Sequence, residues 1–583
     1  MTLSYQKLSK VINLEGYAMT MKAASVTKLI WLSSCHRTMS SLGRAPRYMR
    51  HMATSSLISS FVASGPSSCV LASQHRLTSR ALQLAFMGSS SASLSGTRFM
   101  TSMPESHTQV QDVYQHQIVS ISDAYDSGNG EFVSAEVVSD EQDCDIRVTV
   151  RVKPDPYTDL ENKSHYQYFS FRSTLHLTSP QIQPLIQKSK KDKKSKIRVQ
   201  YILQNAGQAS FANAFRGYST FVSTKSTPFE PEAWKRVGDT GYDDEKGWLI
   251  WNDDFLIENA DMRSLSAYFA YFPPFSYERH MGLVARCAAS PECSVESLGQ
   301  TLSGREIEML TIGTGPRTCW IIHRQHPGES MAEFFAEGLL TRLLSLNDKW
   351  DSVAQRAKEL YTFYIVPNVN PDGSVNGFLR TNAAGSNLNR EWAPSSAPAA
   401  GASETSGDDE STTCKVDYEA PTLSRSPEVY NILRRMDQTS CDAFLDIHGD
   451  EDLPFNFLAG SQGMPNWNKR LESLHGAFLA SYRRANPDMQ QEVSYDPDKP
   501  NEGMKNICSN QIALRFDCFS GTLEMPFKEL WQEEGWGPDR ARQLGASVLD
   551  PLCYIWPYLR NDTAFWDELP PEDAYVNPSS QYK

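Results

Sequence analysis

The chain has 583 residues, too many for one ordinary domain, and its 40% hydrophobic and 21% charged residues are typical of a globular protein. A net charge of −13 argues against a nucleic-acid partner, which requires a basic surface. Eleven cysteines without a Cys-x-x-Cys pair argue against a disulfide framework and favour a reducing compartment. Apolar runs stay shorter than the roughly 18–20 residues that span a bilayer, so we expect a soluble protein without a membrane partner.

The first part of the chain, residues 1–110, differs from the rest in charge. Residues 1–104 carry eleven Lys and Arg but one acid, Glu15. Such a Ser-, Arg- and Met-rich stretch resembles an organellar transit peptide, and the alternative is a poorly defined extension ahead of a later start such as Met39. We expect this segment to be disordered. The expected location is the cytoplasm, or a mitochondrion or plastid if the segment is a transit peptide.

Residues 111–272 have the pattern of short strands. The alternation of Ile197, Val199, Tyr201 and Leu203 with other residues predicts one strand, and the aromatic run from Tyr166 to Phe171 predicts another. Turn signals recur between such runs, at 128–130, 205–207 and 239–241. This punctuation predicts a small antiparallel β-sandwich domain over 111–272.

From about residue 273 to 560, apolar strand-like runs alternate with helical ones. This alternation predicts an α/β domain with a mixed, largely parallel sheet flanked by helices. Residues 394–418 are rich in Ala, Ser, Gly and acids, which predicts a disordered surface insertion. We expect residues 561–583 to form a loose tail. The expected strands are 308–312, 319–322, 361–366, 443–447 and 521–523, and the expected helices include 329–345, 427–436 and 467–484.

Two potential metal ligands follow the strand at 319–322. His326 lies just beyond the strand, and Glu329 lies where the next helix begins. Ligands of an open α/β sheet gather beyond the carboxyl ends of its strands. A catalytic zinc ion usually has three protein ligands, and His448, which ends the apolar strand 443–447, is placed to be the third. Alone, His448 would more often be a structural histidine; its pairing with His326 and Glu329 favours a metal site.

Five motifs in this order resemble those of the zinc metallocarboxypeptidases. Within that family, Tyr277-Glu-Arg-His280, Arg380 ahead of Ser386-Asn-Leu-Asn-Arg390, and the preceding β domain are similar to the cytosolic carboxypeptidase subgroup. Asp446-Ile-His-Gly-Asp450 and Arg515-Phe-Asp with Leu523-Glu-Met-Pro-Phe527 are most similar to its bacterial-type members. The resemblance covers about residues 130–555. Its motifs are His326-Pro-Gly-Glu329, Asn370-Pro-Asp-Gly373, Asn389-Arg390, His448 and Thr522-Leu-Glu524.

The resemblance implies roles for these residues. His326, Glu329 and His448 would hold one Zn²⁺, which acidifies water and polarises the scissile carbonyl. Glu524 would move the proton from water to the leaving amine, although a sheet-edge acid in a salt bridge is the alternative for it. Arg380 would stabilise the developing oxyanion.

Asn389 and Arg390 would bind the terminal carboxylate of the substrate, using the two-pronged guanidinium. A surface ion pair with Glu391 is the alternative for Arg390. The resemblance further implies partners: peptide or protein C-termini, notably glutamate-rich, tubulin-like tails. A basic pocket residue would then be required, for which Lys505 and Arg515 are candidates.

The family also carries a mobile tyrosine before the catalytic glutamate, and Tyr495 is the nearest candidate. Three functions follow from these residues. The first is a zinc carboxypeptidase that releases C-terminal amino acids. The second is a zinc amidohydrolase of small N-acyl amino acids, and the third is a binding module with an inactive site. The complete ligand set, Glu524 and the β domain favour the first.

Overall fold

The computed structural model describes residues 117–138, 144–156, 165–191, 196–224, 230–259, 261–393, 419–531 and 533–561. The segments expected to be disordered, 1–110 and 394–418, and the expected tail beyond residue 561 lie outside these residues. Among the described residues, no helix combines the length and apolarity that a membrane crossing requires.

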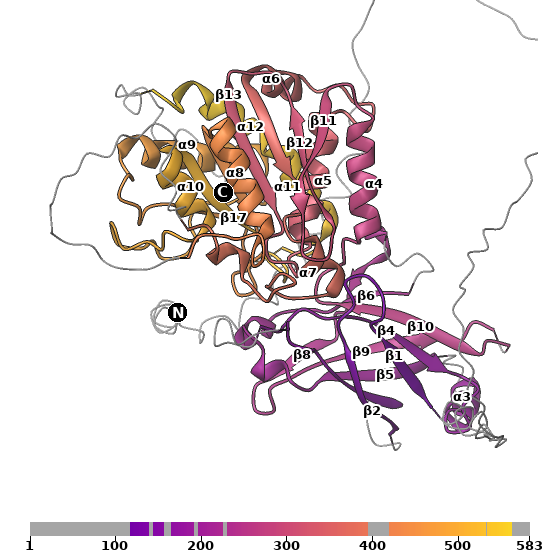
Figure 1. The fold of residues 1–583 in the computed structure, drawn as a ribbon. Coiled ribbons are helices and arrows are strands. Elements are labelled where there is room, and N and C mark those ends of the chain that lie inside the picture. The colour runs from indigo at the N-terminus through magenta and orange to yellow at the C-terminus, as the bar shows by residue number, and fades with distance from the viewer. Residues whose placement is uncertain are drawn as a thin grey trace, which may run out of the picture. The chain divides into compact units, whose positions relative to one another are not determined.

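The first domain in the chain consists of two five-stranded sheets (Figure 1). The pairs are antiparallel as expected, except that β3 and β5 run parallel. One sheet has the order β1 (Val119–Ser122), β4 (Ser170–His176), β10 (Ser264–Ala270), β6 (Phe221–Ser223) and β7 (Lys235–Arg236). The other has the order β2 (Glu131–Val137), β3 (Ile146–Arg151), β5 (Lys196–Leu203), β9 (Trp248–Leu256) and β8 (Thr240–Asp243), and α3 (Gln183–Lys191) connects β4 to β5.

Aromatic side chains from both sheets fill this domain's core. Tyr201 of β5 lies 4.5 Å from Phe269 of β10 and stacks on Trp251 of β9, measured between ring centroids. The strand predicted from Tyr166 to Phe171 starts too early, because β4 begins at Ser170. The preceding segment is held differently: the side-chain amide of Gln167 bonds the backbone N–H and C=O of Phe211.

The second domain contains a seven-stranded mixed sheet. Its strands β14, β13, β15 and β17 run parallel, β12 and β16 are antiparallel to these four, and the edge strand β11 is antiparallel to β12. The order is β11 (Cys293–Gln300), β12 (Glu306–Ile312), β14 (Tyr361–Val366), β13 (Arg317–His323), β15 (Ala443–Ile447), β17 (Phe519–Glu524) and β16 (Phe457–Gly460). Its helices are α4 (Tyr277–Ala288), α5 (Met331–Leu343), α6 (Ser352–Leu360), α7 (Pro371–Asn376), α8 (Pro427–Thr439), α9 (Lys469–Ala485), α10 (Cys508–Phe516), α11 (Pro538–Ser547) and α12 (Leu549–Ile555).

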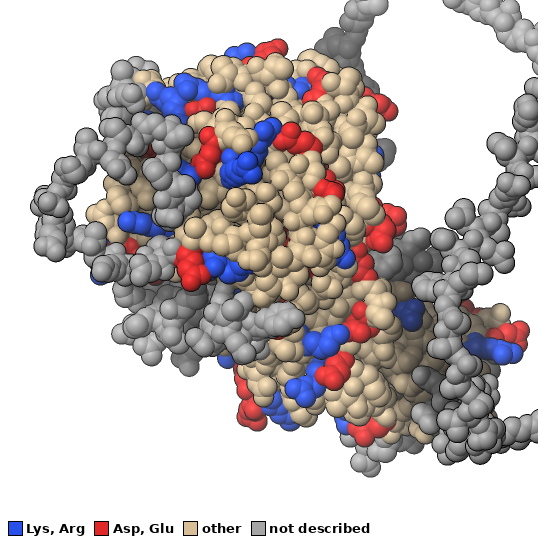
Figure 2. All heavy atoms as spheres, in the orientation of Figure 1, with Lys and Arg blue, Asp and Glu red and all other residues tan. Residues whose placement is uncertain are grey.

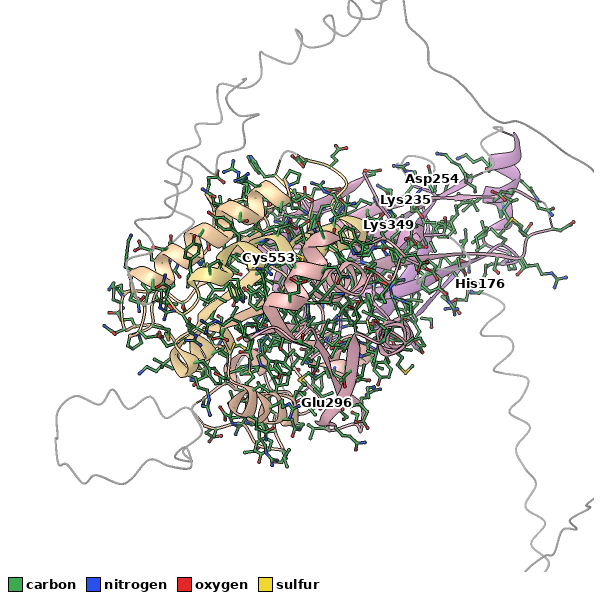
Figure 3. The ribbon with its side chains drawn as sticks, turned by 90° about the horizontal axis from the view of Figure 1, so that it is seen from above. His176, Lys235, Asp254, Glu296, Lys349 and Cys553 are labelled. Carbon is green, nitrogen blue, oxygen red and sulfur yellow. The ribbon has the colours of Figure 1, made fainter. Side chains whose placement is uncertain are left out.

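Helices cover both faces of this sheet, which explains its continuous apolar strands. In β13, Cys319 and Ile321 face a core shared with α5, α9 and α12. Trp320 and Ile322 point the other way, into a core shared with α8 and α10. Figure 3 shows side chains filling the space between these layers.

The three parallel strands β13, β15 and β17 end side by side at His323, Ile447 and Glu524. The polar segments that follow them therefore meet at one edge of the sheet, as predicted. The first domain packs against the second nearby, where Tyr271 stacks on Phe527 with 4.5 Å between ring centroids.

Candidate active site

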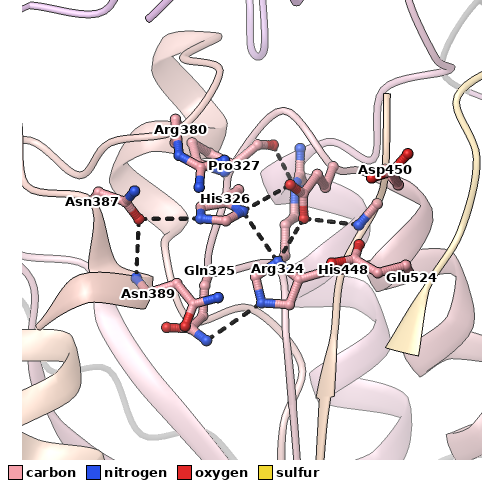
Figure 4. Close-up of polar contacts among 12 residues, drawn as sticks. Arg324, Gln325, His326, Pro327, Arg380, Asn387, Asn389, His448, Asp450 and Glu524 are labelled. Carbon is pink, nitrogen blue, oxygen red and sulfur yellow. Dashed lines mark hydrogen bonds and ion pairs between the residues drawn. The ribbon is translucent and has the colours of Figure 1, made fainter. Parts of the chain in front are cut away.

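Three potential zinc ligands, His326, Glu329 and His448, converge at the carboxyl edge of the sheet; we refer to them as the zinc triad (Figure 4). His326 and Glu329 lie in the turn between β13 and α5, and His448 directly follows β15. Glu329 lies two residues before the helix begins, rather than within its first turn. All three side chains are buried.

The ligating atoms of the zinc triad face one another. Glu329 Oε1 lies 2.8 Å from His326 Nδ1, and Glu329 Oε2 lies 2.9 Å from His448 Nδ1. The two Nδ1 atoms are 3.1 Å apart. Nitrogen and oxygen ligands of a tetrahedral zinc ion lie at comparable separations, since each is about 2.0–2.2 Å from the metal.

The far nitrogen of each ring contacts an acceptor, which determines the tautomer. His326 Nε2 is 3.1 Å from Asn387 Oδ1, and His448 Nε2 is 3.0 Å from Asp446 Oδ2. Both Nε2 atoms donate outward, so in the neutral form of each ring the Nδ1 lone pair points at the Glu329 carboxylate. A divalent cation resolves this convergence of acceptors, so the donor set fits zinc.

Local charges set the protonation of the zinc triad. Burial, reinforced by the Arg380 charge, lowers the pKa of His326 to about 4. Burial alone would raise the pKa of Glu329, but the two histidines hold it below its usual range. His448 behaves oppositely, because Asp446 and Glu329 outweigh its burial and raise its pKa.

Glu524, the last residue of β17, lies beside the zinc triad (Figure 4). Its Oε2 is buried without a hydrogen-bond partner in the described part of the chain, and its Oε1 is 3.3 Å from the Tyr495 hydroxyl. That hydroxyl also donates to Asp450 at 2.6 Å. Burial, with Glu329 and Asp450 nearby, raises the pKa of Glu524. A carboxyl held this way can take up and release a proton.

Three further predicted residues lie on the segment after α7. Arg380 is beside His326 in Figure 4. Asn389 is buried, and its Oδ1 accepts a bond from Cys508 N. Arg390 is half-buried, and its Nη1 donates to the Asn389 carbonyl. Glu391, the alternative partner of Arg390, instead accepts from Arg425 and from the hydroxyl of residue 426.

Comparison with known proteins identifies this arrangement. The family described as zinc carboxypeptidase matches residues 283–530, and the cytosolic carboxypeptidase N-terminal domain matches 121–272. A metallo-carboxypeptidase from Burkholderia cenocepacia is 35% identical, with a TM-score of 0.60, and the match covers 75% of this chain and 98% of that one. The chain belongs to the zinc carboxypeptidase family. Its fold is that of a carboxypeptidase, its enzyme class is metallopeptidase and its cofactor is zinc.

This carboxypeptidase is also similar to a second bacterial enzyme and to a human cytosolic one. A Pseudomonas aeruginosa metallo-carboxypeptidase, in complex with (2-guanidinoethylmercapto)succinic acid, is 31% identical with a TM-score of 0.59, and the match covers 76% of this chain and 100% of that one. Human cytosolic carboxypeptidase 1 is 34% identical over 168 residues. That match covers 25% of this chain but 13% of the much longer human protein.

Sequence reasoning missed the residues that orient the side chains of the zinc triad. Asn387, which bonds His326, stands in the same Ser-Asn-Leu-Asn-Arg motif as Asn389, so its amide was a visible signal. Asp446 lies two residues before His448, and its carboxylate also accepts from Gln325 at 2.6 Å. Gln325 precedes His326 and gives no sequence signal of its own.

A second, largely buried cluster adjoins the turn that carries His326 and Glu329. It consists of His280 of α4, Glu308 of β12, Arg324 and Glu333 of α5, and we refer to it as the ion network. His280 contacts Glu333 at 2.5 Å and Glu308 at 3.2 Å, and Arg324 Nη1 is 2.7 Å from Glu333. Arg324 Nε also donates to the Pro327 carbonyl. The ion network therefore anchors the turn that carries His326 and Glu329, and it gives the Tyr277–His280 motif a structural role.

Proposed function

We propose that the zinc triad of His326, Glu329 and His448 binds one zinc ion and that Glu524 is the catalytic carboxylate of a carboxypeptidase. The observation that carries this proposal is the convergence of two Nδ1 atoms on Glu329 while both Nε2 atoms contact acceptors. Zinc supplies a Lewis acid that acidifies water and polarises a carbonyl.

The remaining steps belong to the chain's own residues. Glu524 takes a proton from the attacking water and delivers it to the departing amine. Its buried Oε2, which lacks a partner in the described part of the chain, supports that role. Arg380, on the His326 side of the zinc triad, stabilises the negative charge that develops on the carbonyl oxygen (Figure 4).

Asn389 and Arg390 bind the free carboxylate of the substrate's last residue. They lie on one short segment, and Asn387 ties that segment to His326 while Cys508 N ties it to α10. This clamp restricts cleavage to chain ends, because only a terminus presents a free carboxylate. Tyr495 is the active-site tyrosine of this carboxypeptidase, given its hydroxyl contact with Glu524.

The preferred substrate is a peptide or protein ending in glutamate, as in a tubulin-like tail. Support comes from the similarity to human cytosolic carboxypeptidase 1 and from one basic candidate near the clamp. Lys505 is exposed and adjoins Asn506, whose amide donates to the Arg390 carbonyl. Arg515 is no longer a pocket candidate, because it forms a two-point ion pair with Asp437.

The surface supports protein rather than nucleic-acid partners. On the face in Figure 2, basic and acidic side chains are interspersed instead of forming one basic patch. The cytosolic relatives favour the cytoplasm as the place of action. Imaging of the full chain tagged at its C-terminus tests this location, and import into an organelle would contradict it.

A C-terminal peptide library, digested and read by mass spectrometry, tests the proposed activity. We expect loss of single C-terminal residues, fastest for glutamate, and little cleavage of matched C-terminal amides. A chelated sample restored with Zn²⁺ is the control. Equal cleavage of acids and amides would exclude the role of Asn389 and Arg390. Faster release of basic C-terminal residues would exclude glutamate specificity. It would instead suggest a substrate with a basic side chain, resembling the guanidino compound bound to the Pseudomonas aeruginosa enzyme.

A further inference from the structure

One carboxylate of the β domain lies inside the catalytic domain's Arg380 loop, residues 379–381. Asp155, shortly after β3, accepts from the backbone N–H groups of Leu379 at 2.7 Å, Arg380 at 2.8 Å and Thr381 at 2.9 Å. The Thr381 hydroxyl donates to it at 3.2 Å. Asp155 is 2% exposed, so these bonds replace its contact with water. A buried carboxylate requires such donors to be tolerated.

The Arg380 loop also contacts the zinc-binding turn. Gly328, between His326 and Glu329, donates its N–H to the Leu379 carbonyl at 3.1 Å. A Cβ at Gly328 would lie 3.0 Å from that carbonyl oxygen and 3.2 Å from the Tyr168 side chain of the β domain. The Thr381 carbonyl accepts from Asn370, which also donates to the Gln325 carbonyl. The loop is thus held between the β domain and the metal-binding turn.

The three N–H groups bind both oxygens of one carboxylate. Asp155 Oδ1 takes the bond from Leu379, and Oδ2 takes those from Arg380 and Thr381. Three consecutive N–H groups aimed at one anion fix the peptide planes on both sides of Arg380. They consequently fix the direction in which its side chain leaves the backbone. A guanidinium that stabilises a transient charge must be placed before that charge appears.

We propose that Asp155 is a positioning residue that acts through Arg380, so the β domain completes the active site of the carboxypeptidase. This inference rests on the proposed role of Arg380 in stabilising the developing oxyanion. It assigns the N-terminal domain a part in the reaction itself rather than in substrate recruitment or solubility. The nearest sequence signal is weak, because Asp155 stands 225 residues from Arg380 and belongs to a different domain.

The first test compares Asp155→Ala with Asp155→Asn in the full-length holoenzyme. We expect Asp155→Ala to lower kcat about 100-fold, the size expected when a catalytic group shifts by about 1 Å, with KM and bound zinc nearly unchanged. Asp155→Asn should lose less, because its amide oxygen still accepts while its NH₂ opposes one N–H. If the alanine variant does not fold, the asparagine variant carries the comparison.

Arg236→Ala is the matched control at the same domain interface. Arg236 donates to the carbonyls of Ser219, Phe527 and Trp536 but does not bond the Arg380 loop. Its loss should lower Tm and leave kcat unchanged. Wild-type kcat in a folded Asp155→Ala, or equal losses of kcat in both variants, would overturn the proposal. Loss of zinc in Asp155→Ala would also overturn it, because Asp155 would then act through the metal-binding turn.

A double-mutant cycle separates a positioning role from general destabilisation. If Asp155 acts through Arg380, adding Asp155→Ala to Arg380→Ala should change kcat less than twofold. The same loss in both backgrounds would overturn the inference. An Arg380→Ala variant with wild-type kcat would instead contradict the proposed function, whatever Asp155 does.

Discussion

Two buried clusters of histidine and glutamate lie near each other in this carboxypeptidase, yet only one suits a metal. In the ion network, the His280 and Arg324 side chains face the Glu333 carboxylate, and the Glu308 carboxylate contacts Nε2 of His280. Cations and anions alternate there. In the zinc triad, His326 and His448 turn their Nδ1 atoms toward one carboxylate and toward each other.

The difference teaches that residue type and burial do not make a metal site. What differs is the partner of the central carboxylate: two ring nitrogens converge on Glu329, whereas an arginine already pairs with Glu333. Asn387 and Asp446 bind the Nε2 atoms of the zinc triad and leave lone pairs pointing inward. In the ion network, one imidazole bridges two carboxylates and the Arg324 guanidinium already pairs with Glu333, so the place that a metal would take is filled.

Removing a ligand of the zinc triad should have the largest effect. We expect His448→Ala to lose bound zinc and to reduce activity to background, because two ligands remain where a catalytic site usually has three. Elemental analysis of the purified variant measures the metal, and His280→Gln serves as the matched variant in the ion network. A full zinc content in His448→Ala would remove this residue from the ligand set.

Glu524→Gln should separate chemistry from metal binding. The amide keeps the shape of the side chain but cannot accept the proton of water. We expect kcat to fall about 10²–10⁴-fold, the usual contribution of a general base, with zinc content unchanged. Single-turnover assays measure the loss, with a library peptide that the wild-type enzyme cleaves as the substrate. Retained turnover would contradict the proposed role of Glu524.

The ion network should instead govern stability. Glu333 and Glu308 outweigh the burial of His280 and raise its pKa to about 9. A raised pKa stabilises the folded state fully below the unfolded value of about 6.5. That stabilisation is lost as pH rises through about 9.

We therefore expect His280→Gln to lower the free energy of unfolding by about 3 kcal/mol below pH 6.5, and by less as pH passes 9. Denaturant titrations between pH 6 and 10 measure it. Zinc content and kcat at low temperature should stay near wild type. A variant that lost zinc at all pH values while remaining folded would remove the distinction between the two clusters.

The sequence predicted the strand ends and offered His326 and His448 as candidate ligands, because an apolar strand closed by His448, or followed by His326, is a local pattern. It also predicted the layered sheet from the alternation of strands and helices. Partnerships between distant segments could not be predicted. Asn387 meets His326 across 61 residues, and Asp155 meets the Arg380 loop across domains. The prediction of Arg515 as a pocket residue was wrong because Arg515 pairs with Asp437. These two residues meet only through the packing of distant segments, which the sequence does not show.

Tyr495→Phe should have the smallest effect among these variants. The hydroxyl donates its single hydrogen to Asp450 at 2.6 Å and lies 3.3 Å from Glu524, so it bonds Asp450 more strongly than it bonds Glu524. Removing it costs about one hydrogen bond, or about 1 kcal/mol. We expect kcat to fall no more than about tenfold, with zinc unchanged.

Asp450→Asn is the matched variant, because it keeps an oxygen that can accept the tyrosine hydrogen while removing a charge near Glu524. If Tyr495 acts mainly by holding Asp450, the two losses in kcat should not add in the double variant. A loss in Tyr495→Phe as large as that in Glu524→Gln would show that the hydroxyl takes part in proton transfer. Catalysis at the zinc triad would then depend on a proton carried by Tyr495, which lies outside the strand ends that position the triad. The ion network, which acts on stability, has no such dependence.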